Sequence, residues 1–399
     1  MAEMMVTVLS MGCGGDTLTL QGRAALERSD YLVGARRLLE EAPAAPSIPR
    51  AEAVRAEDIL SLLLTSGAKS PCVLLSGDGG FYSGAARLLP LLERENIPCE
   101  VLPGVSSLQA FAAKLHKSWQ GWNLHTSHGR DCDPVAAVCG GKPAFFLTGG
   151  TLGPAELCEL LADAGLGELQ VAVGENLGCE GEKLHTGCAA QFAKMTFATL
   201  SVMLAQPAPR YPRRTPGIPD EEFIRDKVPM TKQEVRSAIL GKLAVGPEDV
   251  CWDIGAGTGS VSVELALQCR QVWAVEREES ACALIAVNRK KFGAWNLRLC
   301  RGMAPDCLAG LPAPDKVFIG GSGGNLRPIL EVVKAANPQA RVCLSAIALE
   351  TLHTALAAFE ELGYETEVVQ IAVSRAKKAG ELHLLMAQNP VFLITGERP

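Results

Sequence analysis

The sequence predicts an α/β protein of two units, an N-terminal unit of two subdomains and a C-terminal unit with a Rossmann-like sheet. The chain has 399 residues, which exceeds the usual size of one domain. Apolar strand patterns alternate with helical patterns along most of its length. Residues 206–223 hold five prolines and a basic cluster, which neither a helix nor a central strand accommodates. We therefore expect a first unit at 1–206, a proline-rich linker at 207–219 and a second unit at 220–399.

The N-terminal unit begins with an expected strand at 5–11 and an expected helix at 20–29. Further strands are predicted at 71–77 and 98–104, with helices at 84–95 and 106–115. The alternation continues more loosely through 142–150, 154–165, 169–178 and 196–206. This pattern favours a mainly parallel sheet covered by helices. A sparser stretch near 113–122 indicates two subdomains, at about 1–115 and 120–206.

The C-terminal unit alternates more regularly. Helices are expected at 231–243, 260–268, 278–292, 326–336 and 349–363. Strands are expected at 248–255, 271–276, 297–302, 316–321 and 340–347. Three further strand patterns follow at 364–375, 381–388 and 391–396. Parallel alternation that ends in antiparallel strands predicts an open, doubly wound sheet with a hairpin on one edge.

Composition argues against several classes of protein. Hydrophobic residues make up 48% and charged residues 21%, which suits packed cores and not a disordered chain. The net charge of −6 argues against a nucleic-acid partner. We expect no membrane span and no signal peptide, because long apolar stretches and a basic start are lacking. Fourteen scattered cysteines without a CxxC pair predict free thiols in a reducing cytoplasm and no metal site.

A glycine-rich loop in the second unit indicates a nucleotide-type cofactor. Gly255, Gly257 and Gly259 alternate after an apolar strand, and Ser260 stands where a dinucleotide fingerprint has its third glycine. Asp253, just before the loop, would repel a pyrophosphate but would suit a ligand that carries an ammonium group. Glu276 ends the next strand, where an acid can accept hydrogen bonds from ribose hydroxyls. These residues favour S-adenosylmethionine over a dinucleotide.

The second unit resembles the CbiT-type methylases of cobalamin biosynthesis. The motifs VPMTKQEVR, DIGAGTGSVSVEL, VWAVER, RGMAPDCL and VFIGGSGGNLRPIL carry this resemblance between about residues 220 and 396. It implies a class I methyltransferase fold and an S-adenosylmethionine pocket lined by Thr231, Asp253, Gly255, Ala256, Gly257, Thr258, Gly259, Glu276 and Ala304. The family usually has an aspartate where this chain has Met303. If that aspartate holds the adenine amino group, Met303 can only pack against the ring.

The first unit is similar to tetrapyrrole methylases of the CbiE type. GDGGFYSGAARLL, LPGVSSLQAFAAKL, HTSHGRD, FFLTGG and VAVGENLGCEGEKLHTG occur in the family's order, between about residues 7 and 204. The resemblance implies a two-subdomain fold and a second S-adenosylmethionine site, with Gly77, Asp78, Gly79, Ser106, Ser107 and Thr148 as its residues. Ser106 and Ser107 could equally be helix N-caps. Two loops lack the family's usual proline, at Gly12–Gly15 and at Gly77–Gly80, which loosens these loops without removing a ligand group.

A substrate with many carboxylates calls for arginines and lysines near the cofactor loops. The expected substrate-binding residues are Gly320, Gly321, Ser322, Gly323, Arg225, Lys227, Arg375 and Lys377, and Lys232, Arg236 and Lys378 are further basic candidates. No Ser-His-Asp or Cys-His constellation is present. The catalytic candidates are therefore weak ones, namely His128, Arg327 and Arg375, with His125 as a further possible proton carrier.

Fused in this order, the two halves resemble the decarboxylating precorrin-6Y methyltransferase family. The resemblance implies methylation of carbons 5 and 15 of a precorrin or cobalt-precorrin, decarboxylation of the carbon 12 acetate, one S-adenosylmethionine per unit and a homo-oligomer. Two alternatives stay open. The second unit could methylate RNA or protein instead, which the acidic composition disfavours. The first unit could also be a silent binding or oligomerisation module.

Overall fold

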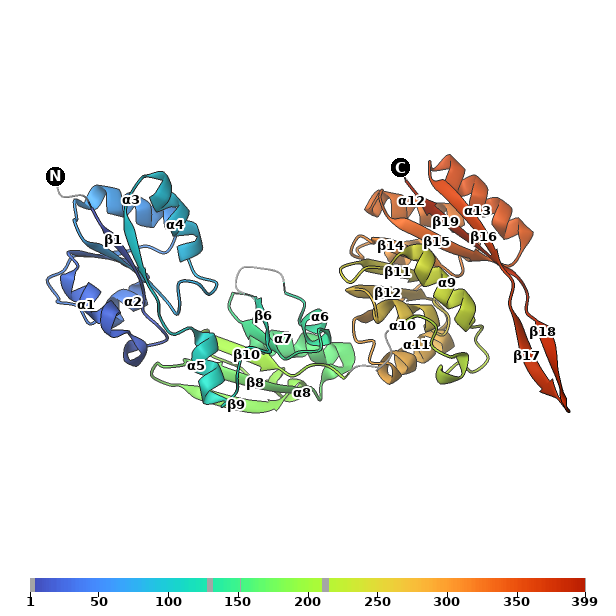
Figure 1. Cartoon of the computed structure of the whole chain (residues 1–399), viewed down its shortest axis with the longest axis horizontal. Helices are drawn as coiled ribbons and strands as arrows, with labels where there is room; N and C mark the ends of the chain where they lie inside the picture. Colours follow the sequence, from blue (N-terminus) through green and yellow to red (C-terminus); the bar gives the residue numbers. More distant parts are fainter. Residues whose placement is uncertain (1–3, 128–131, 151, 210–214, 399) are drawn as a thin grey trace. The chain divides into compact units, whose positions relative to one another are not determined.

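The computed structural model describes residues 4–127, 132–150, 152–209 and 215–398 (Figure 1). The chain divides into two compact units, 1–207 and 208–399, and this division falls at the start of the predicted linker. Among the described residues no helix has the length and apolar character needed to cross a membrane.

The first lobe of unit 1 is built around a five-stranded, wholly parallel sheet in the order β3-β2-β4-β1-β5. Its strands are β1 Val6–Ser10, β2 Tyr31–Gly34, β3 Arg50–Glu52, β4 Pro71–Leu75 and β5 Cys99–Leu102. Its helices are α1 Leu20–Arg28, α2 Arg36–Glu41, α3 Ala56–Ser66 and α4 Ala85–Arg94. Two buried clusters hold helices to the sheet, since β1 contributes Val6 and Val8 to one cluster and Leu9 to the other. The ends of β1, β4 and β5 therefore meet at one edge, which positions the loops that follow them.

The second lobe of unit 1 contains a mixed sheet in the order β6-β7-β10-β8-β9. Its strands are β6 Asn123–Thr126, β7 Ala144–Leu147, β8 Gln170–Glu175, β9 Lys183–Cys188 and β10 Ser201–Ala205. Its helices are α5 Ser107–Lys114, α6 Pro134–Cys139, α7 Pro154–Leu161 with a π-helical extension at Ala162–Leu166, and α8 Ala189–Phe192. The expectation of a mainly parallel sheet is wrong for this lobe, because only β6 and β7 are parallel. A hairpin joins β8 to β9, and β10 inserts antiparallel between β7 and β8.

Unit 2 has the predicted doubly wound, Rossmann-like sheet, in the order β13-β12-β11-β14-β15-β19-β16. Its strands are β11 Val250–Ile254, β12 Gln271–Glu276, β13 Leu297–Arg301, β14 Lys316–Ile319, β15 Arg341–Ala346, β16 Glu365–Ile371 and β19 Val391–Glu397. Its α-helices are α9 Gln233–Leu243, α10 Ser260–Ala266, α11 Glu279–Lys291, α12 Leu326–Ala336 and α13 Leu349–Glu361. The first five strands are parallel, and β19 pairs antiparallel with both β15 and β16.

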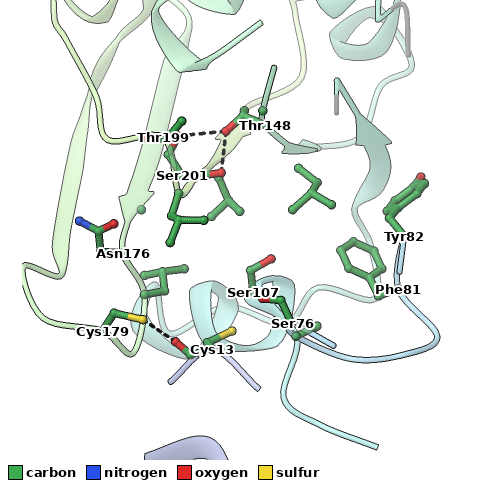
Figure 2. A pocket seen from close by; sticks show the side chains of 18 of the residues that line it. Cys13, Ser76, Phe81, Tyr82, Ser107, Thr148, Asn176, Cys179, Thr199 and Ser201 are labelled. Carbon is green, nitrogen blue, oxygen red and sulfur yellow. Dashed lines mark hydrogen bonds between the residues drawn. The ribbon is translucent and has the colours of Figure 1, made fainter. Parts of the chain in front are cut away.

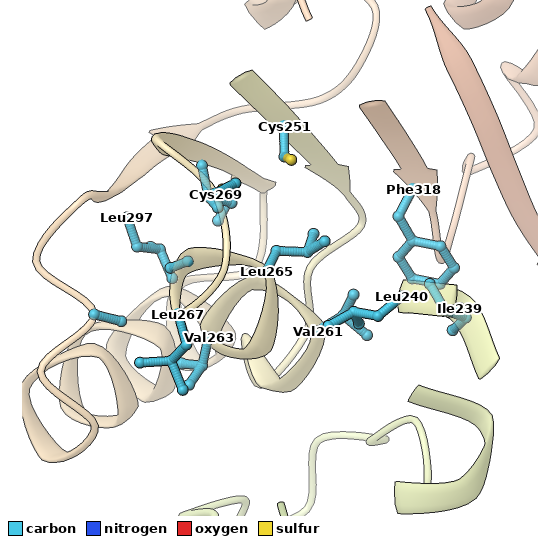
Figure 3. Close-up of a cluster of buried hydrophobic side chains, with 14 of the residues drawn as sticks. Ile239, Leu240, Cys251, Val261, Val263, Leu265, Leu267, Cys269, Leu297 and Phe318 are labelled. Carbon is cyan, nitrogen blue, oxygen red and sulfur yellow. The ribbon is translucent and has the colours of Figure 1, made fainter. Parts of the chain in front are cut away.

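Helices cover both faces of this sheet. One buried cluster joins it to α9, α10 and α11, and Figure 3 shows part of this cluster, with Ile239, Val261 and Phe318 among its members. A second cluster joins the sheet to α12 and α13. Cys251 and Trp252, adjacent in β11, enter different clusters because successive side chains of a strand point to opposite faces. The carboxyl ends of β11, β12 and β14 are thereby fixed side by side.

The expected edge hairpin takes a different form. The predicted strand at 364–375 is divided into β16 and β17 Ser374–Ala379, and β17 pairs only with β18 Leu382–Ala387 among the described strands. These two strands form a separate two-stranded sheet, and the edge of the main sheet is β16. All six residues of β18 are exposed, and Arg375 of β17 pairs with Glu234 of α9.

Candidate functional site

The glycine loop of unit 2 connects β11 to α10 through a backbone that favours glycine. Gly255, Gly257 and Gly259 have φ values of 73°, 56° and 75°. A Cβ at Gly255 would lie 2.6 Å from the carbonyl oxygen of Gly321, so only glycine permits the loops after β11 and β14 to approach this closely. The N–H groups of Gly255 and Ala256 both donate to the carbonyl of Val275 at the end of β12. The carboxyl ends of β11, β12 and β14 are thereby joined.

Glu276 organises the same corner. Its Oε2 accepts the Gly257 N–H at 2.8 Å, and its Oε1 accepts the N–H groups of Arg277 and Glu278 at 2.8 and 2.9 Å. An ionised carboxylate offers about four acceptor positions, so about one remains for a ligand hydroxyl. Glu276 lines a pocket of about 250 Å³.

This second-unit pocket brings together residues from four segments. It is lined by Ile254, Gly255, Val275, Glu276, Arg277, Glu278, Gly302, Met303, Ala304, Gly321, Ser322 and Gly323. Six of these were expected: Gly255, Glu276, Ala304, Gly321, Ser322 and Gly323. Five expected residues lie in the loops after β11 and β14 but do not line the pocket, namely Ala256, Gly257, Thr258, Gly259 and Gly320. Thr231, which lies shortly before α9, does not line it either. Met303 is 38% exposed there, and its Sδ lies 3.8 Å from Nη1 of Arg277.

Asp253 lies beneath the loop, away from the pocket wall. Its side chain is fully buried and accepts a hydrogen bond from the Ser262 hydroxyl of α10. Its Oδ1 has no hydrogen-bond partner among the described residues. Burial raises the pKa of Asp253 to about 7, and the Ser262 hydrogen bond partly opposes this rise. The contacts of this carboxyl connect β11 to the first turn of α10.

The basic candidates of unit 2 lie in different environments. Arg225, Lys227 and Lys377 are exposed. Arg327 pairs with Glu331 at 3.3 Å and with Glu361 at 3.0 Å, so acids on α12 and α13 already share its charge. Arg375 makes a bidentate pair with Glu234 at 2.7 and 2.9 Å.

The expectation that Arg236 serves the substrate is wrong. Its side chain is completely buried, with Nε on Glu264 at 2.9 Å and Nη1 on Asp220 at 2.8 Å. It also donates to the carbonyl groups of Thr231 and Ile218. Since its charge is neutralised inside the unit, Arg236 holds the segment before α9 in place instead of meeting a ligand.

Unit 1 contains a pocket of about 420 Å³ between its lobes (Figure 2). Five of the six expected residues line it, namely Gly77, Asp78, Ser106, Ser107 and Thr148. Gly79 does not line it, and its N–H donates to the Ser10 hydroxyl at 2.8 Å. Residues that sequence reasoning did not single out also line this pocket, including Cys13, Arg37, Ser76, Phe81, Tyr82, Asn176, Cys179 and Ser201.

Close backbone approaches shape this unit 1 pocket. Gly12 and Gly77 exchange backbone hydrogen bonds of 3.1 and 2.8 Å, which tie the loop after β1 to the loop after β4. A Cβ at Gly104 would lie 2.4 Å from the Gly77 carbonyl oxygen, so the loop after β5 completes the same corner. In the other lobe, Thr148 donates to the Ser201 carbonyl at 2.5 Å. Ser106 caps α5 by accepting the Gln109 N–H at 3.2 Å, whereas Ser107 faces the pocket (Figure 2).

Of the two histidine candidates, the structure describes only His125, which does not line this pocket. His128 lies outside the described residues. His125, on β6, is half-buried and stacks on Phe146 with ring centroids 5.4 Å apart. Burial lowers its pKa, so its ring is neutral at physiological pH. Among the described residues, no group of three or more His, Cys, Asp or Glu side chains could hold a metal ion.

The two units match two family models. The model described as Precorrin methyltransferase domain matches residues 221–398, and the model described as Tetrapyrrole (Corrin/Porphyrin) Methylases matches residues 5–193. These matches together span nearly all of both units.

Two relatives and one solved structure are similar to the second unit. A "Probable cobalt-precorrin-6B C(15)-methyltransferase (decarboxylating)" of Pyrobaculum calidifontis is 44% identical over 190 residues, which is 46% of this chain and 97% of that protein. A protein of the same description from Sulfurisphaera tokodaii is 37% identical over 191 residues, 47% of this chain and 100% of its own length. A solved precorrin-6y C5,15-methyltransferase of Geobacter metallireducens is 40% identical and has a TM-score of 0.44, covering 46% of this chain and 98% of that one. The chain therefore belongs, through its second unit, to the family of decarboxylating cobalt-precorrin-6B C(15)-methyltransferases, and a tetrapyrrole methylase unit precedes that unit.

Proposed function

We propose that this chain is a bifunctional, S-adenosylmethionine-dependent methyltransferase that acts on a precorrin or cobalt-precorrin. The second unit would methylate carbon 15 and carry out a decarboxylation, which are the activities in the names of its relatives. We assign the decarboxylation to the acetate on carbon 12. The first unit would methylate carbon 5. The observation that carries the proposal is that each of two methylase units has its own glycine-walled pocket.

The residues of the second-unit pocket fit the proposed cofactor. When bound, S-adenosylmethionine supplies an electrophilic methyl group on a sulfonium centre. Glu276 has an acceptor position left for a ribose hydroxyl, and Gly255 lines the pocket beside it. Met303 and Ala304 offer apolar contact for an adenine ring in place of the aspartate usual in the family. Asp253 keeps its place beneath the loop as a support for α10.

The first-unit pocket suits a larger or more extended ligand. It is lined by loop backbone at Gly77, by the hydroxyls of Ser107 and Thr148 and by the Phe81 and Tyr82 rings. The Phe81 and Tyr82 rings meet edge to face at 4.9 Å, which leaves aromatic surface for a conjugated macrocycle. These features support a methyl-donor site in unit 1, so we propose one S-adenosylmethionine per unit.

Methyl transfer depends more on how the substrate is positioned than on a strong base. The ring carbons of the substrate are already nucleophilic, so holding them in line with the methyl group lowers the barrier. Decarboxylation needs an electron sink, which the conjugated macrocycle supplies. The protein must hold the acetate, for which Arg225, Lys227, Arg375 and Lys377 are the proposed anchors, with Gly320–Gly323 as the adjoining wall.

We also propose that the chain self-associates through the β17–β18 hairpin. Its exposed apolar residues are Leu382 at 68%, Leu384 at 50%, Leu385 at 74% and Met386 at 53%. An isolated two-stranded hairpin is marginally stable in water, and an exposed apolar patch of this kind usually marks an interface. A second copy of the chain would pack against these four apolar side chains of β18.

Calorimetry and product analysis test the proposal. We expect titration with S-adenosylmethionine to reveal two sites per chain. Mass spectrometry of the product from metal-free and cobalt-loaded precursors should show two methyl groups gained and one carbon dioxide lost. A single binding site together with a single added methyl group would instead favour the alternative in which unit 1 is silent.

A further inference from the structure

The unit 1 pocket has only two charged side chains among its described lining residues. Among its described lining residues, Arg37 carries the only positive charge and Asp78 the only negative one. Both molecules that the proposed function brings to this pocket carry carboxylates, namely the amino-acid part of the methyl donor and the side chains of the macrocycle. A carboxylate leaves water at a high cost unless a cation or several N–H groups receive it. The position of Arg37 therefore matters for what the pocket holds.

The Arg37 guanidinium lies where the two lobes meet. Arg37 belongs to α2 of the first lobe, and its Nη2 donates to the Ser76 hydroxyl at 3.3 Å, in the loop after β4. Its Nη1 lies 4.0 Å from Sγ of Cys179, in the β8–β9 loop of the second lobe. Figure 2 places Ser76, Cys13 and Cys179 along one edge of the pocket, opposite Thr148 and Thr199. The guanidinium thus lies at that edge, within reach of a ligand that spans the lobes.

The existing partners of Arg37 leave its charge available. Nη1 forms two contacts of 3.0 Å with Glu41, but the two side chains are 37% and 36% exposed. An exposed pair one helical turn apart is worth little, because water solvates both groups almost as well. The nearby thiols do not neutralise the cation either. Burial raises the pKa of Cys13 to about 11, and the Cys179 thiol donates to the Cys13 carbonyl at 3.0 Å.

We propose that Arg37, together with the Ser76 hydroxyl, forms a carboxylate subsite of the unit 1 pocket. A planar guanidinium can bind a carboxylate through two parallel hydrogen bonds, and the Ser76 hydroxyl can donate a third. The carboxylate comes either from the amino-acid part of the methyl donor or from an acetate or propionate of the macrocycle. This subsite rests on the proposed function of unit 1.

The neighbouring residue provides a matched control. Arg36 forms the same type of pair with Glu40, at 2.9 Å, but these side chains are 77% and 65% exposed and neither lines the pocket. Arg36→Gln and Arg37→Gln remove the same charge from adjacent positions of α2. Arg37→Lys keeps the charge and loses the planar fork, so it should restore part of the binding.

The test combines calorimetry on the full chain with steady-state kinetics of carbon 5 methylation. If the donor supplies the carboxylate, Arg37→Gln weakens one of the two S-adenosylmethionine sites by about 10- to 100-fold and leaves the other unchanged. Decarboxylated S-adenosylmethionine should then bind unit 1 equally weakly with or without Arg37. If the macrocycle supplies it, donor binding stays normal and KM for the macrocycle rises by a similar factor at carbon 5 only.

The inference is overturned if Arg37→Gln matches Arg36→Gln in both donor affinity and KM. In that outcome unit 1 would still methylate carbon 5, so the proposed function would stand. The proposed function fails separately, if the unaltered chain shows no second donor site and no carbon 5 methylation.

Discussion

Glu276 combines two tasks in one carboxylate. It accepts three backbone N–H groups at the corner between β11 and β12, and it lines the pocket where the cofactor is proposed to bind. Because the same oxygens shape the loop and face the ligand, loss of their charge affects both. The neighbouring Glu278 also lines the pocket, but its side chain is 66% exposed and pairs only with Arg277 among the described residues.

We predict that Glu276→Gln lowers the affinity of the unit 2 site for S-adenosylmethionine by about 10- to 100-fold. An amide places N–H groups against backbone N–H groups, and hydrogen bonds to a charged acceptor are the strong ones. Calorimetry measures the change, with Glu278→Gln as the control at less than about threefold. Equal effects of the two substitutions would mean that Glu276 does not anchor the cofactor.

Asp253 makes the stability of unit 2 depend on pH. Folding raises its pKa from the ordinary 3.8 to about 7 because the carboxyl is fully buried. Between these values the folded state keeps a proton that the unfolded state has released. The contribution of this proton to the free energy of unfolding is therefore complete below about pH 4. It declines as pH rises towards 7, by at most about 1.4 kcal/mol per pH unit.

We predict that Asp253→Asn removes this component from the pH profile of unfolding. The unfolding free energy of the unaltered chain minus that of the variant should fall steadily from about pH 4 to pH 7. Urea unfolding of unit 2 at several pH values measures it, and the exposed Asp306→Asn serves as the control. A difference that is constant over this range would show that Asp253 does not titrate within it.

At the scale of elements, glycine-driven loop contacts explain why both pockets occur at strand ends. In unit 2 the loops after β11 and β14 touch at Gly255 and Gly321, and in unit 1 the loops after β1, β4 and β5 touch at Gly12, Gly77 and Gly104. Parallel strands bring these ends to one edge of the sheet. The β17–β18 hairpin instead meets the rest of unit 2 through the ion pairs of Arg375 with Glu234 and Asp220, and its β18 side chains are exposed.

We predict that charged substitutions in this hairpin dissociate the oligomer. Leu382→Glu combined with Leu384→Glu and Leu385→Glu should shift the molar mass measured by light scattering to that of one chain. The unfolding free energy of a single chain should change little, because these side chains are exposed. Leu349→Glu alters a leucine on α13 that is 68% exposed and should leave the mass unchanged. If the unaltered protein is already monomeric, the proposed interface does not exist.

The sequence predicts regular elements well and strand direction poorly. The helices and parallel strands of unit 2 follow clear apolar periodicity, so the doubly wound sheet was predictable. In the second lobe of unit 1, β9 is mostly exposed and β6 has only four residues, so neither has an apolar pattern. The antiparallel insertion of β10 depends on long-range pairing, which local patterns do not encode.

The candidate sites also contain some residues that the sequence predicts and others that it does not. Gly255, Glu276 and Gly77 were predictable because motifs place them at strand ends. Arg37 was not predictable, because it lies on α2 and belongs to none of the glycine-rich motifs. Only the tertiary packing of the chain brings its side chain to the pocket. For Arg236 the sequence predicted a role in substrate binding that the structure does not support. Its side chain is buried against Asp220 and Glu264.

At the scale of the whole molecule, the central claim is that two independent methyl-transfer sites serve one substrate. Each unit has its own buried clusters and its own pocket, and no described lining residue is shared between the unit 1 and unit 2 pockets. A defect confined to one pocket should therefore leave the other functional. Glu276→Gln impairs the second pocket, and Ser107→Trp places a bulky ring in the first pocket, at the first residue of α5.

A complementation assay tests this claim most directly. Each full-length variant is incubated with S-adenosylmethionine and the precorrin substrate, alone and mixed in equal amounts, and the products are identified by mass spectrometry. With the donor held below the weakened dissociation constant of Glu276→Gln, the two-site account predicts at most one added methyl group with either variant alone. The mixture should gain two methyl groups and lose carbon dioxide. Failure of the mixture to form the doubly methylated product, or its formation by Ser107→Trp alone, would contradict the account.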